Sequence, residues 1–219
     1  MKVAQIDWQR ARRPEQKAIR RREILEAAYA LFAELEYEAI SLNAIAREAG
    51  LSKANLYRYF ESREAIFLDL AMEDYTEWVG AVEQALAPLA GSDDEQAVVA
   101  ALVRTFAERP RLCSLASSLS SVLEHNVSVD VVVAFKTRMM TVVLRLGNAV
   151  QVAMPSLSME ATRQFLLVAN FLVAGMWPSA NPPPAVVEAL QRPELEFACI
   201  DFERDLTAAL VAQMRGLKG

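Results

Sequence analysis

The segment from residue 41 to residue 63, SLNAIAREAGLSKANLYRYFESR, constrains the fold of this chain more than any other part. Ser41, Ser52 and Ser62 each stand where a helix is about to begin, and a serine hydroxyl at that position accepts a hydrogen bond from an unpaired backbone N–H. Gly50 stands where the end of a helix favours positive φ. The segment therefore predicts two short helices around a glycine turn, with a further helix starting after Ser62.

Apolar spacing divides these helices into inner and outer faces. The inner positions of the first two are Leu42, Ile45, Ala46 and Ala49, then Leu56 and Phe60. A longer helix ahead of them carries a stripe of its own, formed by Ile24, Ala28, Leu31 and Leu35. Small, amide and phenolic side chains are left on the outside of the second short helix, which is typical of a helix-turn-helix laid into the major groove of DNA.

The stretch from about Arg21 to Tyr75 resembles the DNA-binding domain of the TetR family of bacterial transcriptional regulators. The matches occur in order and with the family's spacing, at Ile24–Ala28, Leu31–Glu34, Ile45–Lys53, Leu56–Phe60 and Ser62–Phe67. The resemblance implies an all-α fold. Residues 1–63 would form a basic arm and a three-helix helix-turn-helix DNA-binding head, and residues 64–219 a helical effector-binding and dimerisation domain.

The resemblance also implies which side chains meet DNA. Cations, hydroxyls and helix N-termini position a protein on the phosphate backbone, whereas contacts to base edges specify sequence. The expected phosphate contacts are Lys53, Tyr57, Tyr59 and Arg63, with Ser41 capping its helix and also reaching phosphate. The expected base-edge contacts are Asn43, Ala54 and Asn55, since Asn pairs with adenine and an Ala methyl group contacts thymine.

Two positions depart from the family's pattern. Glu36 stands where the family usually has Gly, and a non-Gly residue held at positive φ costs roughly 1 kcal/mol, so the first helix is expected to end differently here. Asn43 stands where Arg is common, which removes a strong guanine contact.

These residues also have simpler interpretations. Tyr57 and Tyr59 suit the edge of a core as amphipathic aromatics, and Lys53, Arg58 and Arg63 suit an ordinary solvated surface. The ordered motif around them favours contact with DNA.

Charge is distributed unevenly in this chain of net charge −5. Residues 1–63 hold 12 Lys/Arg against 9 Asp/Glu, whereas residues 64–219 hold 11 against 19. A basic head on an acidic body favours a protein that presents one end to phosphates. The arginines of residues 1–13 suit either an arm in the minor groove or a solvated tail, and Pro14 suits the first turn of a helix that runs to about Leu35.

The sequence favours a cytoplasmic protein without a cofactor or metal. The basic N-terminus is not followed by an apolar run that ends in small residues. The most apolar stretch, residues 165–177, has 13 residues, and a membrane span needs about 20. Cys113 and Cys199 have no metal-type spacing, so we expect two free, buried thiols, with a redox pair between them as the alternative.

Beyond residue 63 the chain has few turn formers and no β alternation, so it is expected to remain helical. After a fourth helix through Val82 and a loop at Gly91–Asp94, the expected helices cover 95–108, 110–124, 128–153, 158–177, 185–191 and 200–216. The helix over 158–177 is apolar nearly all round and must be covered on more than one side. With the resemblance, this assigns 158–177 and 200–216 to a homodimer interface. The alternative is a helix central to a monomer's core.

The resemblance further implies a repressor that a small-molecule effector of unknown identity releases from a palindromic double-stranded DNA operator. The fourth helix, which joins head and body, is the expected lever. An apolar cavity with a few polar anchors would suit such an effector, although Met and aromatic residues at helical spacing far more often form plain core. The candidates are Phe106, His125, Asn126, Phe135, Met139, Met140, Asn148, Met154, Asn170, Phe171 and Trp177.

Two other classes of function remain open from the residues. The chain has one His, no His/Cys/Asp/Glu cluster and no Gly-rich phosphate loop, so an enzyme has no site to nominate. A helical adaptor whose head contacts protein rather than DNA is the second alternative.

Overall fold

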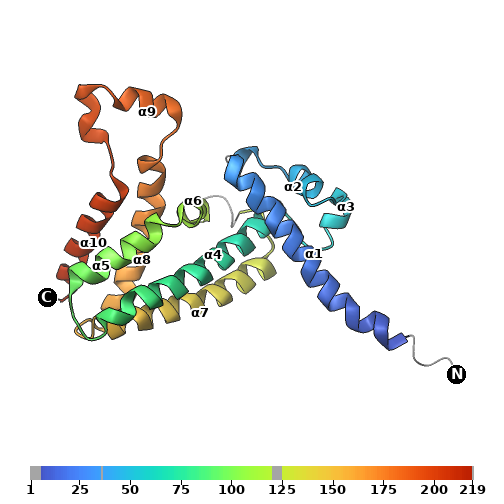
Figure 1. The fold of residues 1–219 in the computed structure, drawn as a ribbon, viewed down its shortest axis with the longest axis horizontal. Coiled ribbons are helices and arrows are strands. Elements are labelled where there is room, and N and C mark those ends of the chain that lie inside the picture. Colours follow the sequence, from blue (N-terminus) through green and yellow to red (C-terminus); the bar gives the residue numbers. More distant parts are fainter. Residues whose placement is uncertain (1–5, 36, 120–124, 219) are drawn as a thin grey trace. The chain divides into compact units, whose positions relative to one another are not determined.

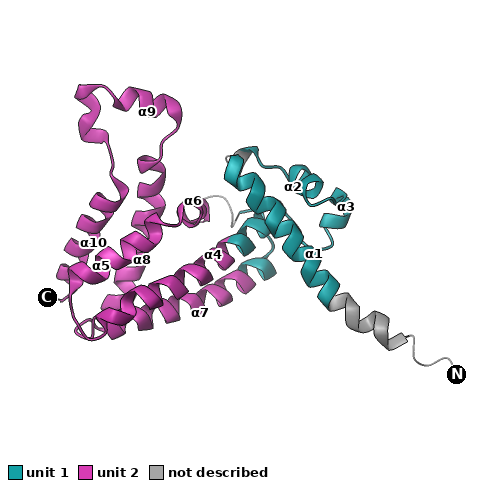
Figure 2. Cartoon of the chain, in the orientation of Figure 1, with its two compact units in different colours: residues 1–70, 122–132 teal, residues 71–121, 133–219 magenta. Residues whose placement is uncertain are grey.

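The computed structural model describes residues 6–35, 37–119 and 125–218 (Figure 1). Within these residues the regular structure is helical throughout, which confirms the predicted all-α class. The chain divides into two compact units, drawn in different colours in Figure 2: residues 1–70 with 122–132, and residues 71–121 with 133–219.

Unit 1 is the predicted head. It contains α1 (Ile6–Glu34), the short 3₁₀ helix η1 (Tyr37–Ala39), α2 (Leu42–Glu48), α3 (Lys53–Leu56) and the first turns of α4 (Arg63–Leu86). Its buried side chains come from all of these helices and from η1 and its flank, and include Ile24, Ala28, Tyr37, Ile40, Ile45, Leu56, Phe60, Ile66 and Phe67.

The first turns of α4 complete the core of unit 1. Ile66 and Phe67 have no exposed surface, and the Phe67 ring meets the rings of Tyr37 and Phe32 edge-on, with centroids 4.9 and 5.4 Å apart. The division between the units therefore lies inside α4, at Leu70, rather than at residue 63 where the sequence placed it.

The N-terminal helix begins earlier than the sequence predicts. It starts at Ile6, so Pro14 lies within α1 rather than in its first turn. The residues around Pro14 are mostly Gln, Arg, Glu and Ala, which are good helix formers. Residues 1–5, and Glu36 with its expected change in helix ending, lie outside the described residues.

A segment from beyond α6 also belongs to unit 1. The backbone N–H of Ser128 donates to Glu61 Oε1 at 2.5 Å, just before α7 (Val129–Ala153) begins. The start of α7 is therefore tied to the residue that follows Phe60 in the head.

Unit 2 holds the rest of α4 and α7 together with η2 (Ala87–Leu89), α5 (Glu95–Ala107), α6 (Pro110–Ser118), α8 (Met159–Ala180), α9 (Pro184–Leu190), η4 (Pro193–Ala198) and α10 (Phe202–Lys218). Within it α8 packs on α6 and α10, and α10 also packs on α5. Most of the predicted helices are found with shifts of a few residues at their ends, and α8 continues through Pro178 to Ala180. The helix predicted over 110–124 is shorter, because α6 ends at Ser118; residues 120–124 lie outside the described residues. The short helix η4 was not predicted.

Of the two cysteines, only Cys113 has the environment predicted for it. Cys113 is buried in α6, whereas Cys199 is exposed, because it lies in the projecting segment between α9 and α10 rather than in the core. Both are free thiols. None of the described helices combines the length and apolar character that a membrane crossing requires.

Candidate nucleic-acid interface

Serine caps define the start of each helix in the motif, as predicted. Ser41 Oγ accepts from the Ala44 N–H at 3.1 Å, Ser52 Oγ from Asn55 at 3.3 Å, and Ser62 Oγ from Ala65 at 3.1 Å. These bonds satisfy N–H groups that have no partner within the helix. They fix where α2, α3 and α4 begin, and so fix which α3 side chains point outward.

The turn between α2 and α3 is built on Gly50. Its φ is +65°, a conformation that costs other L-residues roughly 1–2 kcal/mol. The Leu51 N–H donates to the Ala46 carbonyl at 2.8 Å and the Gly50 N–H to Arg47 at 3.1 Å, which is the bonding pattern of a Schellman ending. The chain then turns directly into Ser52 and α3.

The outer face of this motif is formed by the residues that the sequence nominated. Ser41, Asn43, Lys53, Ala54, Asn55 and Tyr57 are exposed, whereas Tyr59 and Arg63 are partly buried. Tyr57 keeps 50% of its surface exposed, and Lys53 Nζ lies 5.9 Å from the centre of its ring. A cation, an amide and a phenol hydroxyl thus lie together on the exposed side of a short helix.

The helical segment that carries these residues is shorter than expected. Regular helix ends at Leu56, and Tyr57 to Tyr59 form hydrogen-bonded turns. The Tyr57 N–H donates to Lys53 at 3.2 Å, and the Phe60 N–H donates to Leu56 at 3.1 Å. The turns therefore continue the helical course far enough to bury Phe60 beside Leu56.

Arg63 is engaged within the head itself. Its Nη1 donates to the Ile40 carbonyl at 2.8 Å and to the Tyr37 carbonyl at 3.3 Å, and its Nη2 donates to Glu64 at 3.0 Å. The guanidinium also lies 4.2 Å from the centre of the Tyr37 ring. Arg63 thus closes the end of η1 over the start of α4, and its expected phosphate contact stays a prediction.

Glu64 is a buried carboxylate in the same cluster. Burial opposes its ionisation, but its own backbone N–H, Arg63 and the Tyr37 hydroxyl (3.2 Å) together lower the pKa of Glu64 below its usual value. Burial, with the Glu64 charge second, raises the pKa of Tyr37. The phenol therefore stays neutral and donates to the carboxylate.

Arg21 lies in the basic N-terminal part of the chain but is engaged within the head. Its Nη1 donates to the Tyr59 carbonyl at 3.0 Å and its Nη2 binds the Asp69 carboxylate. Its guanidinium lies 4.0 Å from the centre of the Phe60 ring. Arg21 joins α1 to α4 and to the end of residues 53–59, which we call the recognition segment.

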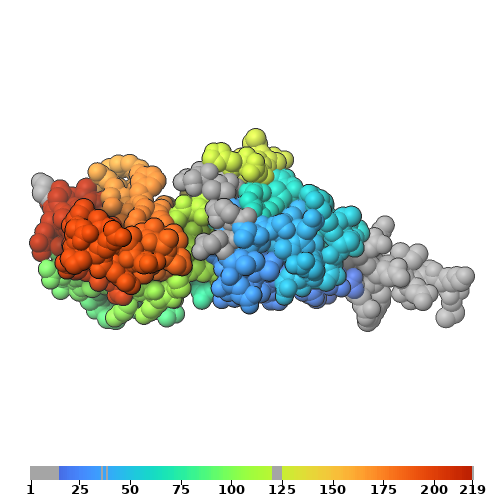
Figure 3. Space-filling view, turned by 90° about the horizontal axis from the view of Figure 1, so that it is seen from above, coloured from blue at the N-terminus to red at the C-terminus, as the bar shows by residue number. Residues whose placement is uncertain are grey.

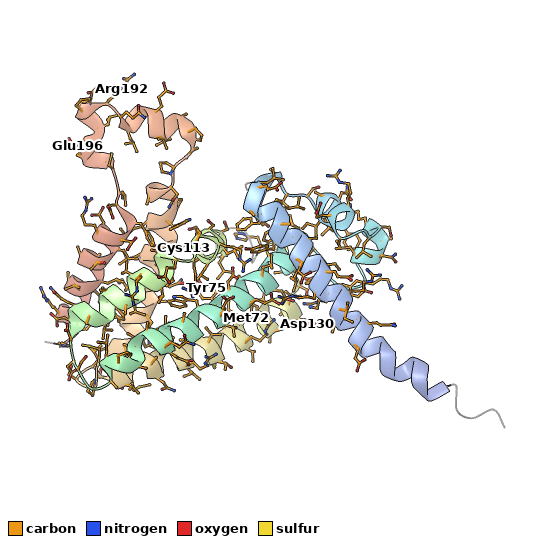
Figure 4. All side chains as sticks on the ribbon, viewed as in Figure 1. Met72, Tyr75, Cys113, Asp130, Arg192 and Glu196 are labelled. Carbon is orange, nitrogen blue, oxygen red and sulfur yellow. The ribbon has the colours of Figure 1, made fainter. Side chains whose placement is uncertain are left out.

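Unit 2 contains a buried polar interior that bears on the effector hypothesis. Asp74 is paired with Arg111, whose Nε lies 2.6 Å from Oδ2, and burial raises the pKa of Asp74 in spite of that pair. Tyr75 Oη donates to Asn170 Oδ1 at 2.9 Å, and Trp78 Nε1 to Thr105 Oγ1 at 3.0 Å. In Figure 4, Met72, Tyr75 and Cys113 lie close together in the view of this unit.

Most of the candidate pocket residues separate into two groups, while Met139 and Trp177 are partly buried. Phe106, Phe135 and Met154 are buried and Asn170 is bonded inside, whereas His125, Asn126, Met140, Asn148 and Phe171 are exposed. The exposed ones do not line an interior cavity of this chain. Apolar periodicity alone could not separate the two groups, because α7 and α8 carry apolar side chains on several faces.

Comparisons with known proteins cover both units. A family model described as "Bacterial regulatory proteins, tetR family" matches residues 24–70, and one described as "Tetracyclin repressor-like, C-terminal domain" matches residues 72–219. An uncharacterized HTH-type transcriptional regulator of Mycobacterium tuberculosis is 50% identical over 64 residues, which are 29% of this chain and 30% of that protein. The HTH-type transcriptional repressor AcnR of Corynebacterium diphtheriae is 39% identical over 57 residues, 26% of this chain and 30% of that protein. The matched region thus spans less than a third of these relatives.

A solved structure extends the likeness along the chain. FadR of Thermus thermophilus, in complex with lauroyl-CoA, superposes with a TM-score of 0.58 over 90% of this chain and 92% of that one, at 19% identity. At that identity the two share a fold. With a matching family model on each unit, and a helix-turn-helix presented as described, the chain belongs to the TetR family of DNA-binding transcriptional regulators, which are transcription factors rather than enzymes.

Proposed function

We propose that this protein is a homodimeric repressor that works in the cytoplasm. Its two heads hold a palindromic operator, and a small-molecule effector releases them. The observation that carries the DNA-binding part is the outward face of α3, on which Lys53, Ala54 and Asn55 are all exposed while Leu56 is fully buried. Each exposed group has a matching chemistry in DNA, either phosphate or a base edge.

Two sets of roles follow for the head. The phosphate backbone of DNA would be contacted by Lys53, Tyr57, Tyr59, Arg63 and Ser41. The base edges would be contacted by Asn43, Ala54 and Asn55. Because the Tyr59 carbonyl and Phe60 ring are held by Arg21, the backbone contacts are presented on a braced segment. Bracing reduces the ordering cost that binding would otherwise incur.

The surface of α8 supports the homodimer. Phe165, Ala169 and Val173 are buried within the chain, but Leu167 and Phe171, four residues apart on another face, remain 46% and 61% exposed. On α10, the small residues Ala208, Ala212 and Gly216 lie on its exposed side. A second copy would cover both faces. It would also supply a second recognition segment one DNA turn away, about 34 Å.

Release by an effector is proposed to act through α4. One continuous helix supplies Ile66 and Phe67 to the core of unit 1, and Tyr75 and Trp78 to the interior of unit 2. An effector that binds better when α4 is displaced shifts the population toward the released state, by no more than its difference in affinity. We propose a small apolar or amphipathic molecule. The neighbour from Thermus thermophilus, which shares the fold, was solved with lauroyl-CoA.

A salt-titrated mobility shift on the DNA upstream of the protein's own gene tests the proposed DNA-binding face. Lys53→Ala is expected to weaken binding to all sequences alike and to reduce the salt slope by about 1. Asn55→Ala is expected to relax base preference at one position of each half-site, by about 1–3 kcal/mol, with the slope unchanged. Arg104→Ala, which removes one cation from α5, is the control for net charge. Absence of sequence-specific binding even at low salt would refute the proposal.

The effector is approached separately. Small molecules that remain bound to the purified protein are released by denaturation and identified by mass spectrometry. A compound that fits the proposal is apolar or amphipathic, and adding it back lowers operator affinity. A co-purified compound that leaves operator affinity unchanged is not the effector.

A further inference from the structure

Residues 181–201 form an arm that leaves unit 2 between α8 and α10. Figure 1 shows α9 at the far end of this excursion, away from α5 and α10, and Figure 4 shows the labelled Arg192 and Glu196 at its tip, far from Cys113 and Tyr75. In Figure 3, which looks down on the arm, its orange atoms lie at the surface. The arm returns to the unit at Phe202, where α10 begins.

The base of the arm is closed and rigid. The rings of Trp177 and Phe202 meet edge-on with centroids 5.0 Å apart, and Trp177 Nε1 donates to Ser114 Oγ at 3.0 Å. Pro182, Pro183 and Pro184 then limit the backbone as the chain moves away. The contacts at the root of the arm and the three prolines therefore restrict the backbone more than a Gly/Ser-rich linker would.

Beyond that base, the arm has no core of its own. Among the described elements, α9 and η4 pack mainly on each other. None of residues 181–201 is buried, and Phe197 is 86% exposed. Val186, Val187 and Ile200 are 43%, 46% and 37% exposed. Ordering such a segment costs conformational entropy, and apolar burial normally offsets that cost. Within the single chain this burial is missing.

The charged residues of the arm indicate which kind of surface it can bind. The arm carries four acidic residues, Glu188, Glu194, Glu196 and Asp201, and one basic residue, Arg192. DNA phosphates and anionic lipid surfaces would repel it. Exposed apolar groups within an acidic rim instead match a protein surface that is itself apolar.

This chain carries such a surface on the helix that leads into the arm. Leu167 and Phe171 are exposed on α8, and α10, into which the arm returns, exposes Ala208 and Ala212. The arm is thus continuous in sequence, at both ends, with the two helices assigned above to the dimer. In a two-fold dimer each copy supplies one arm and receives one, so the buried area counts twice.

We propose that the arm of each subunit packs against unit 2 of a second copy, extending the interface formed by α8 and α10, with Phe197 as its main apolar anchor. The inference rests on the proposed homodimer, but it adds a specific element to it. The dimer would then be held by the two exchanged arms, residues 181–201 of each subunit, which we call the clasp, as well as by helix packing.

Cys199 provides a direct test, because it lies in the arm and is exposed. The other thiol, Cys113, is buried, and burial raises its pKa to about 12, so it does not compete for reagent at neutral pH. The full-length protein is labelled at Cys199 with a benzophenone maleimide. Labelled chains are mixed with ¹⁵N-grown, unlabelled chains and illuminated, and the cross-linked peptides are mapped by mass spectrometry. Cys199→Ser is the control for specific labelling.

The expected result is a covalent dimer in which a light-isotope arm is joined to a ¹⁵N peptide from unit 2. Cross-links confined to the arm's own chain, in a sample that sedimentation shows to be dimeric, would overturn the clasp and leave the dimer standing.

A substitution supplies the second readout. Phe197→Asp is expected to raise the dimer dissociation constant at least tenfold by sedimentation velocity, with helical content and thermal unfolding of the isolated subunit unchanged, since Phe197 packs on little within its own chain. Phe197→Leu, which keeps an apolar anchor, is expected to stay within about threefold of the parent. Phe171→Asp tests the α8 face independently.

The outcomes separate the two proposals. Loss of the dimer with Phe171→Asp but not with Phe197→Asp would refute the clasp alone, and would also be the result if the arm bound a different protein. A parent protein that stays monomeric at micromolar concentration would refute the proposed homodimer and the clasp together.

Discussion

At the scale of single residues, the head depends on two arginines whose structural roles could not be assigned from the sequence. Arg21 looks like one of many basic residues near the N-terminus but joins three parts of the head. Arg63 matches a phosphate-binding position but donates to two backbone carbonyls of its own domain. Guanidinium groups suit both tasks, since they present several donors in a fixed plane.

Arg21→Ala is expected to weaken operator binding several-fold while leaving the salt slope unchanged. The substitution removes the hydrogen bond to the Tyr59 carbonyl and the ion pair with Asp69, which together hold the recognition segment in place. The same change is expected to lower the free energy of unfolding by about 1–2 kcal/mol. Arg20→Ala is the matched control, because Arg20 is exposed and its ion pair is with Glu23 on the next turn of the same helix, at 2.6 Å. A slope reduced by about 1 in Arg21→Ala would show instead that Arg21 contacts phosphate.

Glu64 gives the head a pH dependence. Its folded-state pKa is lowered, so its stabilising contribution is complete above the unfolded-state value of about 4.3 and is lost as the pH falls through the lower folded-state value. The parent is expected to unfold at a higher temperature than Glu64→Gln at pH 7, and this difference in unfolding temperature is expected to disappear at a pH well below about 4.3. Glu34→Gln, at an exposed position on α1, serves as control. A difference of equal size at both pH values would contradict this assignment.

At the scale of elements, the helix-turn-helix is specified by local chemistry. The three serine caps and Gly50 are each set by bonds to residues within five positions along the chain. They were predictable from the sequence for that reason. The arm at 181–201 is the opposite case, because the contacts proposed for it are made with a second chain and not with residues nearby in the sequence.

Gly50→Ala is expected to destabilise the protein by about 1–2 kcal/mol, since alanine must adopt φ near +65° there. No heavy atom lies within 4 Å of the added Cβ, so the cost is in the backbone alone. Gly80→Ala in α4 is the control. It also meets nothing within 4 Å, but it lies in a regular helix and is expected to gain about 0.5–1 kcal/mol. Thermal unfolding of both variants measures the two signs, and a stabilised Gly50→Ala would contradict the turn geometry.

At the scale of the whole molecule, the proposed operator must match two recognition segments. Inserting about 5 base pairs between half-sites rotates them to opposite sides of the duplex and is expected to reduce affinity at least tenfold. Inserting about 10 restores the rotation and is expected to recover part of it. Binding titrations on the three operators measure the effect. Equal affinity for all of them would mean that each head binds alone.

The sequence predicted more of the detailed structure of unit 1 than of unit 2. In unit 1, the caps, the turn and the inner positions Ile45 and Leu56 follow from short-range rules, and all are found as predicted. Arg21 and Asp69 are 48 positions apart, so their contact depends on how α1 lies against α4 and leaves no local signal. In unit 2, helix positions were predictable, but the exposure of Met140, Phe171 and Cys199 was not, since apolar periodicity does not say which faces a single chain covers.

The shared helix α4 limits how this protein can be recombined with others. Because Ile66 and Phe67 belong to the core of the head, a hybrid regulator that grafts this head onto a foreign sensor must keep the native sequence through Leu70. A junction at residue 63 would place foreign side chains in the middle of that core, so the DNA-binding head would be destabilised whether or not an effector is present. The boundary between DNA reading and effector sensing therefore lies inside a helix, so the sequence of α4 has to serve both functions at once.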